Sequence, residues 1–280
     1  MTDQATRFAA FRALHEGPGA FVIPNPWDAG SARILTALGF AALATTSAGY
    51  AFSAGKRDSA ACLTRDEILG NARAIVEATH LPVSADLEDG FGAAPEACAE
   101  TITRAIAAGL VGGSIEDAIG DAAHPIHDAG HATERIAAAA EAARGQPFLL
   151  TARAENYLWG RPDLADTIAR LQAFSEAGAD VLYAPGLPDL DAIRTVCAEV
   201  DRPVNVVMGL KGASYSTAEL AEAGVRRISV GGSMARAALG ALKRAAEEVQ
   251  TRGTFTYAQD AMEDAEAAAL MTQGQPVRRT

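Results

Sequence analysis

Charged side chains stand at the ends of three predicted β-strands, where a parallel sheet presents its side chains to a ligand. Asp86 and Glu88 close one strand, Glu116 closes the next, and Arg153 and Glu155 close the one after that. Carboxylates that converge in this way repel one another strongly unless a cation lies among them. An arginine beside them is suited to bind a carboxylate through two hydrogen bonds. The pattern therefore predicts a site for a divalent cation and an anionic substrate.

The spacing of these acids indicates which of them share a face. Side chains alternate along a strand, so Asp86 and Glu88 are expected to point into the same space and Asp89 away from it. Oxygen ligands alone favour Mg²⁺ or Mn²⁺ over Zn²⁺, with water in the remaining positions. Two other interpretations stay open. Acids at strand-to-helix turns also cap the following helix, and Arg153 also fits a structural ion pair with a neighbouring glutamate.

Short apolar runs alternate with Ala-rich amphipathic stretches along almost the whole chain. Strands are predicted near residues 20–25, 41–47, 82–88, 112–117, 148–155, 180–185, 203–208 and 227–232. Helices are predicted at residues 28–38, 65–79, 95–108, 133–144, 162–177, 190–199, 217–223 and 234–250. Eight strand-helix units without a linker fit an α/β fold, one (β/α)8 TIM-type barrel with extra N- and C-terminal helices. A doubly wound sheet is the alternative, but its glycine fingerprint after the first strand is missing.

The barrel domain is predicted to span residues 1–255. Residues before Gly19 are expected to form a helix that covers the bottom of the barrel, and residues 256–280 a further helix and a frayed tail. A helix outside the barrel count often packs on a neighbouring subunit. We therefore expect a homo-oligomer, either a dimer or a tetramer.

Composition and charge exclude several kinds of partner. The 280 residues are 49% hydrophobic, enough to bury a large core, and the formal charge of -11 argues against nucleic acid, which requires a basic face. Cys62, Cys98 and Cys197 lack metal-ligand spacing and fit a reduced cytosol. Neither a signal sequence nor an apolar run long enough to span a membrane is found, so we expect a cytoplasmic protein with no membrane partner.

Other polar residues are weaker candidates for a site. Ser47 and Asn205 end apolar strands and fit either a ligand or a buried backbone group. His124, His127 and His131 cluster in one Gly- and Ala-rich segment after the fourth strand. That segment fits a solvated loop or a lid that carries an acid-base group.

Several stretches together resemble the isocitrate lyase/phosphoenolpyruvate mutase superfamily. In chain order they are IPNPWDAGSARILTALGF, TTSAGYAFSAGKRDS, LPVSADLEDGFG, GGSIED, TARAE, GADVLYAPGLPD and RRISVGGSMARAA. The combination is specific, and it covers nearly the whole predicted barrel. The resemblance implies that Mg²⁺ holds a small anionic 2-oxo acid or its enolate while a C–C or P–C bond is broken or made at the adjacent carbon.

The resemblance also implies roles for individual residues. Asp86, Glu88 and Glu116 are implied to surround the metal, partly through water, with Asp58 close by. Arg153 is implied to bind the 2-oxo acid. Thr46, Ser47 and Ala48 are implied to hold the substrate carboxylate, and we add Tyr50 and Asn205 as second-tier substrate contacts.

The predicted lid departs from the pattern of the superfamily. Isocitrate and methylisocitrate lyases carry a lid cysteine that delivers a proton, and phosphonomutases carry a Lys-x-Asn lid; DAIGDAAHPIHDAGH contains neither. A lid histidine, His124 or His127, is our hypothesis for the proton donor. Pro185 stands where the lyases have a glutamate after the sixth strand.

These observations predict an Mg²⁺-dependent lyase or hydrolase that cleaves a C–C bond of a small 2-oxo or 2-hydroxy dicarboxylate, similar to isocitrate, methylisocitrate or oxaloacetate, through a metal-held enolate. The alternatives are a phosphonate enzyme and a barrel that binds a 2-oxo acid with weak turnover. Because Glu88 and Arg153 are predicted at the rim, Glu88→Gln and Arg153→Ala are expected to cost activity far more than stability.

Overall fold

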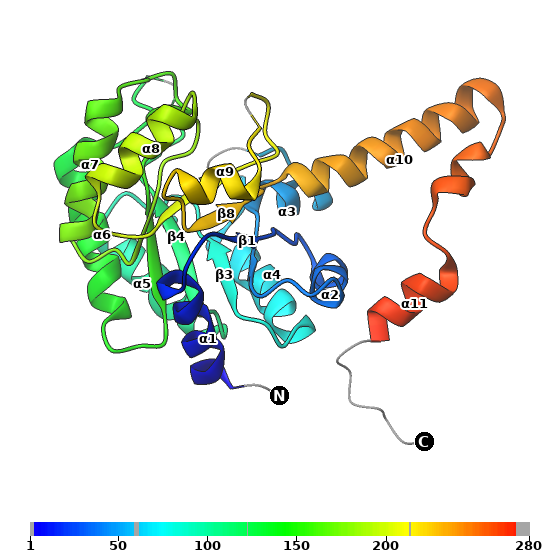
Figure 1. Ribbon diagram of the computed structural model, residues 1–280. Helices are drawn as coiled ribbons and strands as arrows, with labels where there is room; N and C mark the ends of the chain where they lie inside the picture. Colours follow the sequence, from blue (N-terminus) through cyan, green and yellow to red (C-terminus); the bar gives the residue numbers. More distant parts are fainter. Residues whose placement is uncertain (1–2, 59–61, 122, 213, 273–280) are drawn as a thin grey trace.

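Eight parallel strands form one sheet that curls into a barrel in the computed structural model, which describes residues 3–58, 62–121, 123–212 and 214–272 (Figure 1). The strands are β1 (Phe21–Ile23), β2 (Leu43–Ala44), β3 (Val83–Asp86), β4 (Gly112–Glu116), β5 (Leu149–Arg153), β6 (Val181–Tyr183), β7 (Val204–Val207) and β8 (Arg227–Ser229). Neighbours pair in the order β1-β8-β7-β6-β5-β4-β3-β2. Between β1 and β2 the amide of Ala44 donates to the carbonyl of Pro24 at 3.0 Å, so the barrel is nearly closed. The predicted (β/α)8 TIM-type fold is confirmed.

Helices alternate with the strands and cover the outside of the barrel. They are α2 (Ala29–Ala37), α4 (Arg65–Ala78), α5 (Pro95–Ala107), α6 (Ala129–Ala143), α7 (Leu164–Glu176), α8 (Leu190–Glu199), α9 (Thr217–Glu222) and α10 (Ser233–Arg252). Local sequence signals fix their starts: Thr64 and Glu67 form the predicted capping box of α4. Helix α6 begins four residues before its predicted start, because the side chain of Asp128 caps it by accepting the amide of His131 at 3.0 Å.

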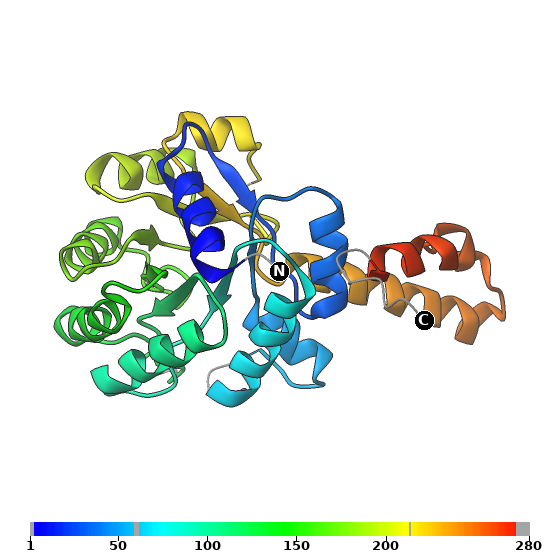
Figure 2. The ribbon, with the colours of Figure 1, turned by 90° about the horizontal axis from the view of Figure 1, so that it is seen from below.

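The N-terminal helix α1 (Gln4–Glu16) covers the bottom of the barrel, as predicted. Figure 2 views the molecule from that side and shows α1 in front of the strands. Phe11 of α1 is completely buried in a cluster with Ile23, Val111 and Leu149. A Cβ atom on Gly112 of β4 would lie 2.8 Å from the Phe11 ring, so the close approach of α1 requires glycine there. The opposite end of the barrel therefore remains for a site.

A short helix, α3 (Ser47–Ser53), begins directly after β2 and was not predicted. The predicted strand over 41–47 is confined to Leu43–Ala44, because the Thr46 hydroxyl accepts the amide of Gly49 at 3.2 Å and caps a helix at that point. The first turn of α3 therefore faces the carboxyl end of the barrel. Ser47 lies in this turn and not at the end of a strand.

The C-terminal segment leaves the barrel as an arm (Figure 1). Helix α10 is mostly exposed and is followed by the 3₁₀ helix η1 (Thr256–Asp260) and helix α11 (Asp264–Thr272). Met271 of α11 lies beside Gly30 of α2 in the same chain. Residues 273–280, the predicted tail, lie outside the described residues. Among the helices of the described residues, none combines the length and the hydropathy needed to cross a membrane.

Candidate active site

A cavity of about 520 Å³ opens at the carboxyl ends of the strands, where the active site of a (β/α)8 barrel is built. It brings together most of the residues predicted for the site. Those that line it are Thr46, Ser47, Ala48, Asp58, Asp86, Glu88, Glu116 and Arg153. They come from β3, β4 and β5 and from the segment that follows β2, so segments distant in the sequence meet at one point.

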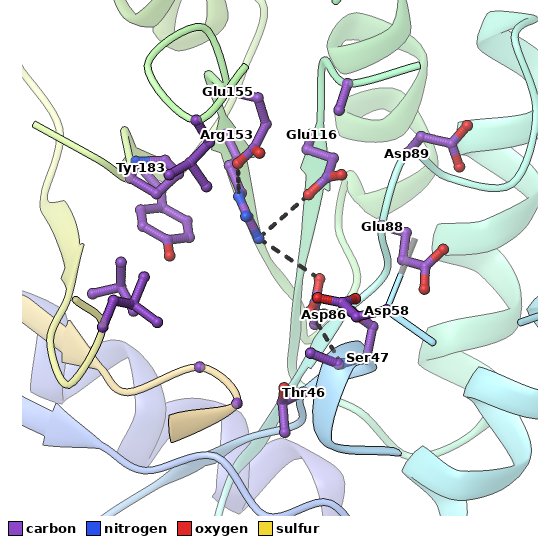
Figure 3. A pocket seen from close by; sticks show the side chains of 18 of the residues that line it. Thr46, Ser47, Asp58, Asp86, Glu88, Asp89, Glu116, Arg153, Glu155 and Tyr183 are labelled. Carbon is purple, nitrogen blue, oxygen red and sulfur yellow. Dashed lines mark hydrogen bonds and ion pairs between the residues drawn. The ribbon is translucent and has the colours of Figure 1, made fainter. Parts of the chain in front are cut away.

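Arg153 lies at the centre of the charged side chains (Figure 3). Its Nη1 atom is 3.3 Å from Glu116 Oε2 and 4.0 Å from Asp86 Oδ1, and its Nε donates to Glu155. The guanidinium also lies over the ring of Tyr183, 4.9 Å from its centroid. No described residue accepts a hydrogen bond from the Nη2 atom of Arg153. One edge of the guanidinium is therefore left for a substrate anion.

Asp86 links the central cluster to the first turn of α3. Its Oδ2 atom accepts the amide of Ser47 at 3.1 Å and the hydroxyl of Ser47 at 2.8 Å. The amide of Asp86 in turn donates to the Thr45 hydroxyl at 3.0 Å. These bonds hold the carboxylate at the mouth of the barrel and place the start of α3 beside it.

Two glutamates flank Arg153, of which Glu155 is buried and Glu116 is half-buried. Burial raises the pKa of Glu116 and of Glu155 above the ordinary range, although Arg153 opposes the shift in both. The backbone of Glu155 is held in place because its amide donates to Asp117 Oδ1 at 2.8 Å, and Arg170 pairs with the other oxygen of Asp117 at 3.0 Å. Removal of Arg153 would therefore leave one buried and one half-buried carboxyl group without their cation.

Glu88 lies apart from Arg153, on the other side of Asp86 (Figure 3). Strand β3 ends at Asp86, and Glu88 has a φ of 49°, so strand alternation does not place it; it lines the cavity nevertheless. Burial, together with the charges of Asp86, Asp89 and Asp58, raises the pKa of Glu88 to about 8. Burial and Asp86 also raise the pKa of Asp58. This side of the cavity therefore carries more negative charge than the protein itself compensates.

This shift makes the stability of the metal-free protein depend on pH. A carboxyl group whose folded pKa is raised from 4.5 to about 8 gives its full stabilisation below pH 4.5 and loses it as pH rises towards 8. In the presence of EDTA, we expect Tm to fall between pH 5 and pH 8, and Glu88→Gln to make that fall smaller. Thermal melts check this, with the exposed Glu134→Gln as control. An equal fall in Glu88→Gln and in the wild type would show that Glu88 ionises normally.

Four of the predicted site residues lie outside the described lining of the cavity. Tyr50 is half-buried in α3, and Asn205 is buried inside the barrel, where it donates to Ser229 at 3.1 Å and accepts from Arg227 at 2.9 Å. His124 is exposed and lies 3.6 Å from Asp121. His127 is buried against His131, and burial lowers its pKa to about 4. Asn205 therefore satisfies groups inside the barrel, and the proton-donor role of the two histidines stays a prediction.

The cavity also contains residues for which we made no prediction. Tyr183 and Arg236 line it, and burial raises the pKa of Tyr183 to about 12. Arg236 donates to the Gly209 carbonyl at 3.5 Å and forms no ion pair with any described residue. Tyr183 ends its strand and pairs with Asn205 across β6 and β7, so its place could have been found by the same strand-end argument. Arg236 lies one turn into α10, where the sequence gives no signal.

The carboxylates of the cavity have the chemistry needed to bind a hard divalent cation. The donors of the cation site predicted here, Asp86, Glu88 and Glu116, are all oxygens, and the raised pKa of Glu88 marks negative charge that a cation would relieve. No three acid, histidine or cysteine side chains of the described ranges already converge closely enough to hold an ion directly. The donor set therefore fits an ion held partly through water, as Mg²⁺ commonly is.

Comparison with known proteins decides the family. Residues 11–250 match the family described as phosphoenolpyruvate phosphomutase. The chain belongs to this family. The 2-methylisocitrate lyase of Escherichia coli (strain K12) is 29% identical over 249 residues, which cover 86% of this chain and 82% of that enzyme.

Solved structures of similar fold cover nearly the whole chain. A crystal structure from Burkholderia cenocepacia J2315, described only as a lyase/mutase, is 58% identical, covers 98% of this chain and 97% of its own, and has a TM-score of 0.93. A 2,3-dimethylmalate lyase, a PEP mutase/isocitrate lyase superfamily member, is 29% identical over 97% and 95% of the two chains, with a TM-score of 0.85. The predicted superfamily is confirmed, and it is one of lyases and mutases, which supports an enzyme.

Proposed function

We propose that this chain is an Mg²⁺-dependent lyase or hydrolase that cleaves a C–C bond of a small 2-oxo or 2-hydroxy dicarboxylate. The observation that carries the proposal is Arg153, which is held between acids at the mouth of the barrel with one edge of its guanidinium unengaged. Two of the similar proteins are named as lyases, of 2-methylisocitrate and of 2,3-dimethylmalate, which favours bond cleavage.

In this proposal Arg153 binds and orients the 2-oxo acid. Its Nη2 atom donates to the substrate carboxylate, while Glu155 and the ring of Tyr183 keep the guanidinium in one orientation. Bond cleavage leaves an electron pair on the enolate of the 2-oxo acid. The positive charge of Arg153 stabilises this negative charge, which develops in the transition state, more than it stabilises the bound substrate. The first turn of α3, with Ser47 and Ala48, borders the same space.

Asp86, Glu88 and Glu116 would hold the divalent cation, Mg²⁺ or Mn²⁺, with Asp58 beside them. When bound, the ion supplies Lewis acidity towards the developing enolate oxygen. Ser47 donates to Asp86 twice and so fixes the orientation of that carboxylate. The raised pKa of Glu88 implies that cation binding releases a proton near neutral pH.

A thermal-shift screen tests the proposal. Pyruvate, oxaloacetate, 2-oxoglutarate, isocitrate, methylisocitrate and phosphonopyruvate are each added with Mg²⁺ and with EDTA. We expect Tm to rise for 2-oxo acids only when the metal is present, since a ligand that binds the folded state alone stabilises it. Acids that raise Tm are then assayed for cleavage. If no acid gives a metal-dependent shift, the carboxylate cluster is structural and the proposal is wrong.

A phosphonate enzyme is the second candidate, because the matching family is described as phosphoenolpyruvate phosphomutase. Its substrate would present a phosphonate where the first candidate presents a second carboxylate, and Arg236 is a further cation in the lining. Conversion of phosphonopyruvate followed by ³¹P resonance separates the two. Loss of the phosphonate signal together with no cleavage of any dicarboxylate would favour this candidate. A barrel that binds the 2-oxo acid with weak turnover would give thermal shifts without either reaction.

We also propose that the protein is a homo-oligomer in which a second copy covers the C-terminal arm. Leu242 and Phe255 are each 65% exposed, and both lie on this projecting arm. Large apolar side chains exposed together on one surface indicate a site of protein–protein contact. Light scattering on the full chain is expected to give a dimer or a tetramer, and Leu242→Glu to shift it towards the monomer. An oligomer that Leu242→Glu leaves intact would place the interface elsewhere.

A further inference from the structure

One side of the cavity carries large apolar side chains that are exposed. Leu158 is 47% exposed, Trp159 37% and Leu210 39%, and all three line the cavity together with Pro185 and Val207. They follow β5, β6 and β7, whereas the carboxylates of the proposed metal site follow β3 and β4. Exposed apolar side chains inside a concave site indicate a surface that a ligand covers.

The loop that carries two of these side chains has a fixed conformation. Asn156 is fully buried, and its side chain donates to the carbonyls of Arg161 and Asp163 at 3.3 and 3.1 Å and to the Thr167 hydroxyl at 2.7 Å. The amides of the residues at 158 and 159 donate to the Glu155 carbonyl at 2.9 and 3.2 Å. The loop is therefore pre-formed and is bound to a residue that pairs with Arg153.

The loop is also packed tightly against the segment after β6. Gly186 has a φ of 86°, and a Cβ atom there would lie 2.9 Å from Leu158 Cδ2. Glycine is required both by this backbone conformation and by the seat of Leu158. One side of Leu158 thus packs against the backbone at Gly186, and its other side is exposed to the cavity.

We propose, on the basis of the proposed function, that Leu158, Trp159 and Leu210 form a subsite for an alkyl substituent at C3 of the substrate, the carbon next to the 2-oxo carbon. A pre-formed apolar wall gains most from a hydrocarbon chain, which displaces water without leaving a buried polar group unpaired. The volume of about 520 Å³ also leaves room for more than a three- or four-carbon acid.

A series of ligands with constant charge tests the subsite without requiring turnover. Calorimetry on the full chain with Mg²⁺ measures Kd for pyruvate, 2-oxobutyrate, 2-oxopentanoate and 2-oxohexanoate, which differ only in methylene groups. We expect Kd to fall about threefold to fourfold for each added methylene. The heat-capacity change of binding should become more negative along the series, as it does when apolar surface is buried.

Variants assign this gain to the wall. Leu158→Ser and Trp159→Ser are each expected to reduce the gain per methylene to less than twofold. Leu38→Ser, which removes an exposed leucine at the C-terminal end of α2 and outside the cavity lining, should leave the gain unchanged. If pyruvate binds with Mg²⁺ but the longer acids bind no more tightly, the subsite is wrong and the proposed function stands. Absence of metal-dependent binding by every acid, pyruvate included, would overturn both.

Discussion

Replacement of Arg153 by methionine is expected to lower kcat/KM by about a thousandfold and to destabilise the fold by about 3–5 kcal/mol. The loss of activity follows from the loss of the group that binds the 2-oxo acid. The loss of stability follows from burial, because the side chain of Arg153 is only 17% exposed and is the cation of Glu116 and Glu155. Our expectation that Arg153→Ala would cost activity far more than stability assumed a rim position. Urea titration and steady-state kinetics measure the two effects.

The effect of Arg153→Met on stability should depend on pH. Without the guanidinium, the folded-state pKa values of Glu116 and Glu155 rise further above their ordinary value near 4.5. The unfolded chain contributes equally in the variant and the wild type, so the pH dependence of the deficit is set by the folded-state pKa values alone. The deficit is smallest where both glutamates are protonated in both folded proteins, and it grows as pH rises through the folded pKa values that Arg153 holds down in the wild type. Arg153→Lys, which retains the charge but not the planar fork, should recover stability more than activity. A deficit in Arg153→Met that is the same at pH 5 and pH 8 would mean that these glutamates do not depend on Arg153.

Replacement of Asp86 by asparagine is expected to lower kcat about a thousandfold at saturating Mg²⁺ without lowering stability. Asparagine keeps the size of the side chain and one acceptor for Ser47, but it removes a charge from the proposed metal site. The same charge raises the pKa of Glu88 in the metal-free protein, so its removal should hold Tm constant or raise it in EDTA. Lower activity combined with equal or greater stability distinguishes a functional charge from a structural one.

The matched control for Asp86→Asn is Asp191→Asn, which makes the same chemical change at a carboxylate that is 89% exposed and paired with Arg194. It should alter neither kcat nor the Tm increase that Mg²⁺ produces. Calorimetric titration with Mg²⁺ alone adds a readout independent of turnover, and Asp86→Asn should bind the ion at least tenfold more weakly. If Asp86→Asn keeps more than a tenth of the wild-type kcat, Asp86 does not belong to a catalytic metal site.

The architecture and most of the charged groups of the candidate site follow from the order of residues along the chain. Apolar runs that alternate with amphipathic stretches require eight strand-helix units, and parallel strands joined by helices bring their carboxyl ends to one edge. Residues at those ends, such as Asp86, Glu116 and Arg153, therefore meet in one cavity whatever the details of packing. Helix starts were equally local, because Thr64 and Glu67 cap α4 with their own side chains. Short-range chemistry and chain topology were sufficient for these features.

The hydrogen bonds and ion pairs among those groups, and the apolar side chains on the other side of the cavity, became visible in the folded chain. The sequence left open whether Arg153 serves a substrate or a structural ion pair. The structure shows it paired with Glu116 and Glu155, while no described residue accepts a hydrogen bond from Nη2. We expected Asn205 at the end of a strand, but it is the second residue of β7 and lies inside the barrel, where it bonds to Arg227 and Ser229. The apolar wall of Leu158 and Trp159 also escaped the sequence, since a loop residue shows its exposure only once its neighbours are placed. Burial and pairing depend on contacts between distant segments, and no local pattern of residues encodes them.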